Sequence, residues 1–124
     1  MSPAADPIPI RERLRRALPT AMKARDSTAV TALRTAVAAI DNAESVDATL
    51  TPTAGPIAGA VSGLGAGEAA RRVLSEADMV TLVRAEVDAR EADAAECDAA
   101  GQTEHAARLR AEAAVLAAVL DAEI

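Results

Sequence analysis

The run TEHAARLRAEAAVLAAVL at residues 103–120 decides the fold. Its apolar residues recur at alternating steps of three and four, which places them along one side of an α-helix that packs against a neighbour. This seam consists of Ala106, Leu109, Ala113, Leu116 and Leu120. Val115 and Val119 widen the seam, so we expect this helix to contact more than one partner.

A second helix precedes this run and is separated from it by a short break. Gly101 is typical of a helix C-terminus, and Thr103 can cap the helix that follows. Ser75 and Asp78 resemble a capping box, which predicts a helix from about residue 76 to residue 100. Its predicted apolar face consists of Val80, Val83, Val87 and Ala94, with Met79 and Leu82 beside them. The short break predicts that the two helices form an antiparallel hairpin.

Two further helices are expected near the start of the chain. The first begins near Ile10, and Pro19 inside it predicts a kink or a break. Asp26 or Ser27 is a plausible N-cap for the second, whose pattern stops near Glu44. The expected stripes are Leu14, Leu18 and Met22 in the first helix and Val30, Leu33, Val37 and Ile40 in the second.

Residues 45–70 have a different composition, rich in Thr, Pro, Ala and Gly. Such a composition buries too little apolar surface to offset the loss of backbone entropy, so we expect a long flexible loop. Residues 1–9 contain three prolines and are expected to form an extended arm. The sequence thus predicts an all-α bundle of about four helices, forming one domain over residues 10–124.

Composition limits the possible functions. The chain has 124 residues and contains no Phe, Tyr or Trp, so it cannot bind single-stranded nucleic acid by stacking bases on aromatic rings. Its net charge is −6, although residues 1–40 hold seven basic residues against three acidic ones. The basic first helix is expected either to pair with the acidic later helices or to meet an anionic partner.

Nothing in the sequence indicates a secreted or membrane protein. Cys97 is the only cysteine, so an internal disulfide is impossible. The first sixteen residues lack the apolar core of a signal peptide, and no apolar run is long enough to span a bilayer. We therefore expect a cytoplasmic protein.

Three patterns in the sequence resemble sites of chemistry, and none meets the requirements of such a site. The glycines at residues 63–67 lack the flanking strand or the Lys-Ser/Thr ending of a nucleotide loop. Cys97 and His105 supply two ligands, whereas zinc needs three or four from the protein, and they are interpreted as a packing cysteine and a surface histidine. The carboxylates over residues 86–98 are interpreted as a solvated acidic face. No catalytic residue, cofactor site or metal site is therefore predicted.

Basic residues near the start form the candidate contact surface for RNA or for a partner. They are Arg11, Arg15, Arg16, Lys23, Arg25 and Arg34. The alternatives for them are ion pairs within the fold, or contacts to RNA phosphate or to an acidic protein surface.

Several stretches resemble the GatB/YqeY-like family. The most specific is the series Ala21-Met22-Lys23-Ala24-Arg25-Asp26, Ala32-Leu33-Arg34 and Ala38-Ala39-Ile40-Asp41-Asn42-Ala43-Glu44. Arg84-Ala85-Glu86-Val87, Arg90-Glu91-Ala92, Ala99-Ala100-Gly101-Gln102 and residues 112–120 also resemble it. The likeness covers about residues 10–44 and 73–121 and corresponds to the N-terminal helical domain only. Fuller members continue beyond the point matching residues 121–124 into a second helical bundle, which is expected to be absent here, and many have a more basic third helix.

The resemblance implies an all-helical accessory domain related to the tail of the B subunit of the aspartyl/glutamyl-tRNA amidotransferase. By association it implies carbon–nitrogen ligase activity with glutamine as amido donor, with no catalytic residue in this domain. The implied partners are tRNA and an amidotransferase- or tRNA synthetase-type protein.

Two other functions remain open from the sequence. A helical protein–protein adaptor, or a homo-oligomer, could use an exposed Val115 and Val119 face for binding. An independent enzyme would need a nucleophile–base pair, a metal set or a nucleotide loop, and the sequence offers none of these.

Overall fold

The computed structural model describes residues 8–50 and 73–122, and within these ranges it contains four α-helices and no strand. They are α1 (Ile10–Lys23), α2 (Ser27–Leu50), α5 (Glu76–Ala99) and α6 (Thr103–Asp121). The predicted all-α bundle is therefore confirmed. The predicted arm at residues 1–9 lies outside the described residues, except for Ile8 and Pro9, and so does the predicted loop from residue 51 to residue 70.

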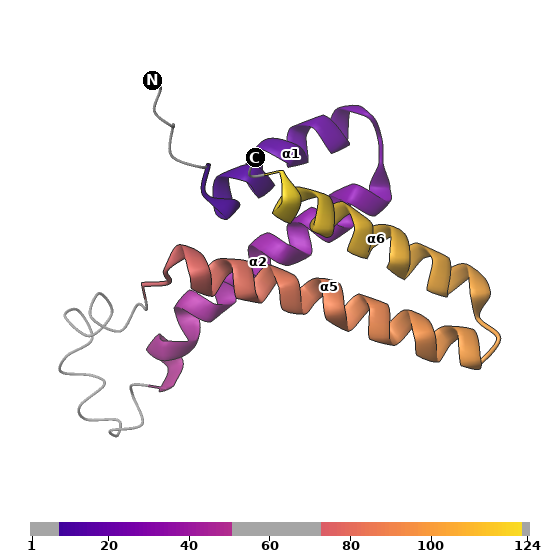
Figure 1. Cartoon of the computed structure of the whole chain (residues 1–124). Helices are drawn as coiled ribbons and strands as arrows, with labels where there is room; N and C mark the ends of the chain where they lie inside the picture. Colours follow the sequence, from indigo (N-terminus) through magenta and orange to yellow (C-terminus); the bar gives the residue numbers. More distant parts are fainter. Residues whose placement is uncertain (1–7, 51–72, 123–124) are drawn as a thin grey trace.

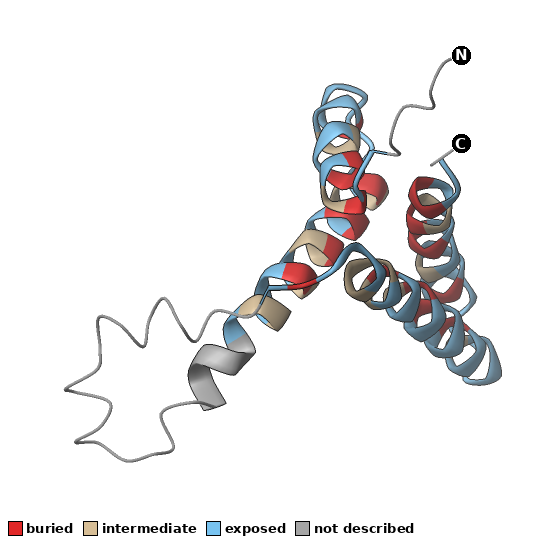
Figure 2. Cartoon of the chain, turned by 60° about the vertical axis from the view of Figure 1, so that its left-hand side comes forward, coloured by how far each residue is buried: buried red, intermediate tan, exposed pale blue. Residues whose placement is uncertain are grey.

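The helices form two hairpins that share one core (Figure 1). One hairpin is α1 with α2, and the other is α5 with α6, as predicted from the short break around Gly101. Helix α2 packs against all three other helices. Figure 2 shows that the buried residues line the faces that the helices turn toward one another. The α5–α6 hairpin extends well beyond α1 and α2, so its turn lies far from them (Figure 1).

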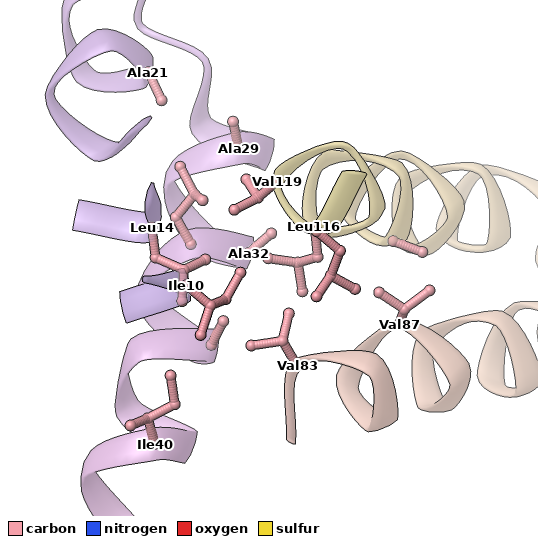
Figure 3. Packing of buried hydrophobic residues seen from close by; sticks show 14 of the residues in the cluster. Ile10, Leu14, Ala21, Ala29, Ala32, Ile40, Val83, Val87, Leu116 and Val119 are labelled. Atoms are coloured by element: carbon pink, nitrogen blue, oxygen red, sulfur yellow. The ribbon is translucent and has the colours of Figure 1, made fainter. Parts of the chain in front are cut away.

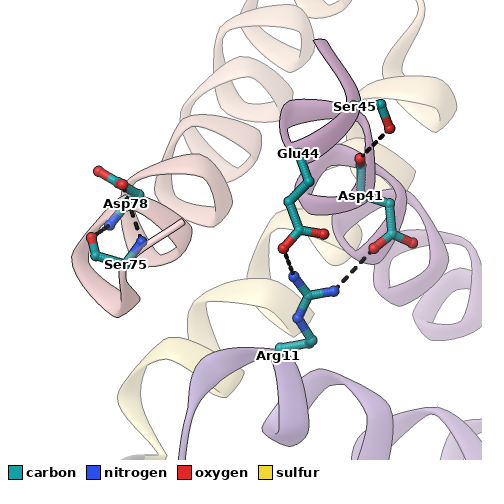
Figure 4. A network of polar contacts seen from close by, with 6 residues as sticks. All are labelled: Arg11, Asp41, Glu44, Ser45, Ser75 and Asp78. Carbon is teal, nitrogen blue, oxygen red and sulfur yellow. Dashed lines mark hydrogen bonds and ion pairs between the residues drawn. The ribbon is translucent and has the colours of Figure 1, made fainter. Parts of the chain in front are cut away.

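Two of the three predicted N-caps are confirmed by the structure. Asp26 precedes α2, and its Oδ1 accepts a hydrogen bond from the Ala29 amide at 3.0 Å. Ser75 and Asp78 form the predicted capping box at α5 (Figure 4). The predicted cap at Thr103 is wrong, because the N-cap of α6 is Gln102 and its side chain makes no capping hydrogen bond.

Two predicted boundaries differ from the structure. Helix α1 continues through Pro19 to Lys23, so of the predicted kink or break at Pro19, the break does not occur. Proline removes only one backbone donor, and the following turn is held by the Ala24 amide, which donates to Thr20 O at 3.0 Å. Helix α2 runs past Glu44 to Leu50, because no glycine or proline occurs before Pro52.

The core lies where α2 meets the other helices (Figure 3). Its largest fully buried side chains are Ile10, Leu14, Leu33, Ile40, Val83 and Leu116. Ala29, Ala32 and Ala36 are also buried, and these small residues allow the helices to approach closely. Met22, predicted to belong to the stripe of the first helix, is 49% exposed.

The apolar width of α6 is used within the fold. Val119 is 9% exposed, and Val115 is partly buried against the core. The expectation that these two valines form an exposed face for a partner is therefore wrong, because α6 packs against α2 as well as α5.

None of the helices that the structure describes is long and apolar enough to cross a bilayer.

Candidate functional site

The turn between α1 and α2 is the centre of the candidate site. The Arg25 amide donates to Met22 O at 3.1 Å, and the Asp26 amide donates to Ala21 O at 3.0 Å. This pair of hydrogen bonds is the Schellman motif, which requires a residue in the left-handed conformation just after the helix. Arg25 occupies that position with a φ of 56°. A left-handed conformation disfavours any residue with a Cβ, and glycine is the usual choice there.

The same motif ends α5, and there the sequence supplies glycine. The Gly101 amide donates to Asp98 O at 3.0 Å, and the Gln102 amide donates to Cys97 O at 2.7 Å. Gly101 has a φ of 81°, and an added Cβ would meet no atom within 4 Å. Glycine is favoured at this turn by backbone conformation and not by lack of space. The two turns therefore differ chiefly in that one carries a charged side chain.

Two of the six predicted basic residues are paired within the fold. Arg11 donates to Asp41 at 3.0 Å and to Glu44 at 2.5 Å, which joins α1 to α2 (Figure 4). Arg16 donates to Glu12 at 3.0 Å, one helical turn away, and both side chains are more than half exposed. Exposed pairs of this kind are weak, so Arg16 is held less firmly than Arg11.

The other four predicted residues are exposed. Arg15, Lys23, Arg25 and Arg34 make no side-chain hydrogen bond or ion pair with any residue in the described ranges 8–50 and 73–122. Lys23 and Arg25 flank the turn itself. Arg15 and Arg34 lie about eight residues from it along α1 and α2, which corresponds to roughly 12 Å along each helix. We call these four residues the turn cations.

Sequence reasoning missed Arg13, which is buried at 8% exposure. Its guanidinium donates to Val119 O at 2.7 Å, to Leu120 O at 3.1 Å and to Ile8 O at 2.9 Å. It also lies 3.6 Å from Glu76, whose carboxylate accepts a hydrogen bond from the Ile10 amide at 2.8 Å. Arg13 therefore has a structural role, joining the start of α1 to the end of α6.

A second buried charge cluster lies within the α5–α6 hairpin. Arg90 donates to Glu112 at 2.9 Å and to Glu86 at 2.7 Å, and Arg90 and Glu112 are each 8% exposed. Burial alone would lower the pKa of Arg90, but the hydrogen bonds and charges of the two carboxylates outweigh it, and the net pKa is raised. Glu86 precedes Arg90 by four residues on the same helix, whereas Glu112 lies on α6.

Cys97 and His105 line one shallow depression beside the α5–α6 turn, with a volume of about 410 Å³. Cys97 is half-buried and His105 is exposed, which agrees with a packing cysteine and a surface histidine. No group of three or more His, Cys, Asp or Glu side chains within residues 8–50 and 73–122 is arranged to hold a metal ion.

Comparison with protein-family models, with curated protein sequences and with solved structures finds no match to this chain. The kinship with the GatB/YqeY-like family stays a prediction that rests on the sequence runs given above.

Proposed function

We propose that this chain is an accessory domain in tRNA-dependent amidation, which binds tRNA phosphates through the turn cations. The amidation chemistry belongs to an amidotransferase- or synthetase-type partner. The observation that carries the proposal is the left-handed Arg25 between α1 and α2.

Arg25 stands where the backbone favours glycine. A non-glycine residue in this conformation costs about 1–2 kcal/mol, and strained residues of this kind cluster at functional sites. The positive charge gains some stability from the C-terminal end of α1, about 0.3–1 kcal/mol for an exposed group. That gain only partly offsets the backbone cost. No contact of the Arg25 side chain within the described ranges offsets the remainder, which supports a role for this residue in binding.

The arrangement of the turn cations suits a phosphate backbone. Lys23 and Arg25 lie at the apex, and Arg15 and Arg34 extend the positive charge along both helices. Contacts of this kind position a protein on a nucleic acid without reading its bases. They also need no aromatic platform, which this chain lacks.

The family resemblance supports the same turn. The first part of its most specific series, residues 21–26, builds the connection between α1 and α2. Ala21 and Asp26 have evident structural roles, because Ala21 is buried and Asp26 caps α2. The side chains of Lys23 and Arg25 have no comparable role, which leaves them available to a ligand.

Fluorescence anisotropy with a labelled tRNA transcript at rising salt tests the proposal. Four phosphate contacts predict that log K falls with log salt with a slope of about −3 to −4. Lys23→Gln combined with Arg25→Gln should weaken binding and make the slope shallower by about 2.

A double variant of equal charge change provides the control. Arg84 and Arg108 are exposed on α5 and α6 and have no ion pair within the described residues. Arg84→Gln combined with Arg108→Gln should reduce the slope by much less. Absence of tRNA binding at low salt, or equal weakening by both double variants, would overturn the proposal.

A further inference from the structure

The α5–α6 hairpin changes character along its length. Its half nearest α1 and α2 contributes Val83 and Val87 from α5, and Ala113, Leu116 and Val119 from α6, to the main core. The core ends at Val87 and Ala113. Beyond these residues, and within the described ranges 8–50 and 73–122, α5 and α6 pack against each other and contribute no further residue to the main core (Figure 1).

The buried Arg90–Glu112 ion pair lies just beyond the end of the core. It joins α5 to α6 at 2.9 Å, and Glu86 holds the other side of the guanidinium. We call residues 91–111, from this pair to the turn and back, the hairpin arm.

The interior of the hairpin arm is thin. Among its residues, all of which are described, only Ala94 and Ala106 are fully buried, while Cys97 and Leu109 are half-buried. Alanine buries little apolar surface, and helical segments this short are marginal in water by themselves. The arm also holds five acidic residues against Arg108 and Arg110, which adds repulsion within it.

We propose that the hairpin arm opens and closes as a unit while the core stays folded, and that the Arg90–Glu112 pair is the latch that holds it closed. Opening separates the two helices beyond the latch and exposes Ala94, Cys97 and Ala106. The core residues of α5 and α6 remain packed against α2 during this motion.

Native-state hydrogen exchange, resolved by residue with NMR, separates this motion from global unfolding. Amides of the arm should exchange about tenfold or more faster than amides of residues 33–40 and 114–120. Ile40→Val weakens the core and should accelerate core amides by about fivefold, while arm amides keep their rates. If Ile40→Val accelerates arm and core amides by the same factor, the arm does not open by itself.

The latch has its own test. Glu112→Gln removes the charge with little change of shape, and it should accelerate arm amides by about tenfold. The matched control is Asp98→Asn, which removes the exposed Arg110–Asp98 pair within the same arm, and it should change arm rates by less than about twofold. Equal effects of Glu112→Gln and Asp98→Asn would overturn the role of the buried pair as the latch.

Discussion

Arg13 donates a hydrogen bond of 2.7 Å to the main-chain carbonyl of Val119, although the two residues are 106 positions apart in the sequence. The last carbonyls of a helix lack partners within the helix, and a buried guanidinium satisfies them and complements the negative end of the helix. The start of α1 and the end of α6 are therefore joined by charge as well as by apolar contact.

Arg13→Met should lower the free energy of unfolding by about 2–4 kcal/mol, because it leaves the carbonyls of Val119 and Leu120 without this donor. Urea unfolding followed by circular dichroism measures the change. Arg15→Met, an equal substitution at an exposed position, should stay within about 0.5 kcal/mol of the wild type. Equal losses in the two variants would contradict the structural role of Arg13.

Arg25→Gly should make the protein more stable and the RNA contact weaker. Glycine adopts the left-handed conformation without the steric cost that Arg25 has. The substitution also removes a favourable charge at the end of α1 and raises the entropy of the unfolded chain. The net expected gain in the free energy of unfolding is about 0.5 kcal/mol. The same variant should bind tRNA less tightly, as the anisotropy titration would show. If Arg25→Gly is less stable than the wild type and binds tRNA as tightly, both expectations are contradicted.

Ser75→Ala should lower stability by about 1 kcal/mol, because it removes the acceptor of the Asp78 amide at the start of α5. Thermal unfolding by circular dichroism measures the effect. Thr103→Ala is the matched comparison, since Thr103 lies at the start of α6 without capping it, and its change should be under about 0.5 kcal/mol.

In a double-mutant cycle at Arg90 and Glu112, the two single substitutions should lower the free energy of unfolding by unequal amounts. Arg90→Met leaves Glu112 buried without its cation and should cost about 3 kcal/mol or more. Glu112→Leu should cost less, because Glu86 still pairs with Arg90. The double variant should be close to wild type, since a well-packed apolar pair replaces a buried ion pair at little cost. Losses that simply add would contradict direct coupling between the two charges.

The pH dependence of the stability lost in Arg90→Met follows from the raised pKa of Arg90. A cation whose folded-state pKa is raised contributes stability that is fully present below its ordinary pKa. The contribution disappears only when the pH rises through the higher folded-state pKa. The loss caused by Arg90→Met should therefore stay constant from neutral to moderately alkaline pH in unfolding titrations. A decline within that range would contradict the assignment.

Periodicity predicted the helices well because Leu33, Val83 and Leu116 stand at regular helical spacings and all are buried. Met22 satisfied the same spacing, yet it is 49% exposed and lies one residue before the end of α1. Spacing alone shows which side of a helix a residue occupies, and it does not show how far the neighbouring helix extends.

The buried charges were harder to foresee. Arg90 continues the stripe of Val83, Val87 and Ala94, and Arg13 lies four residues before Ala17 and eight before the buried Ala21. A charged residue in a stripe position was the available signal. The partners of the two arginines could not be predicted from the sequence, because Glu112 and the carbonyl of Val119 lie on a different helix from the arginine that each one binds.

The central position of α2 has a consequence for how the molecule can be divided. Each hairpin alone would present half of a core, with Leu33 uncovered on one piece and Leu116 on the other. Polypeptides corresponding to the two hairpins should each be poorly structured in isolation and regain helix when mixed. This chain is therefore suited to fragment complementation, in which α2 supplies the surface for reassembly.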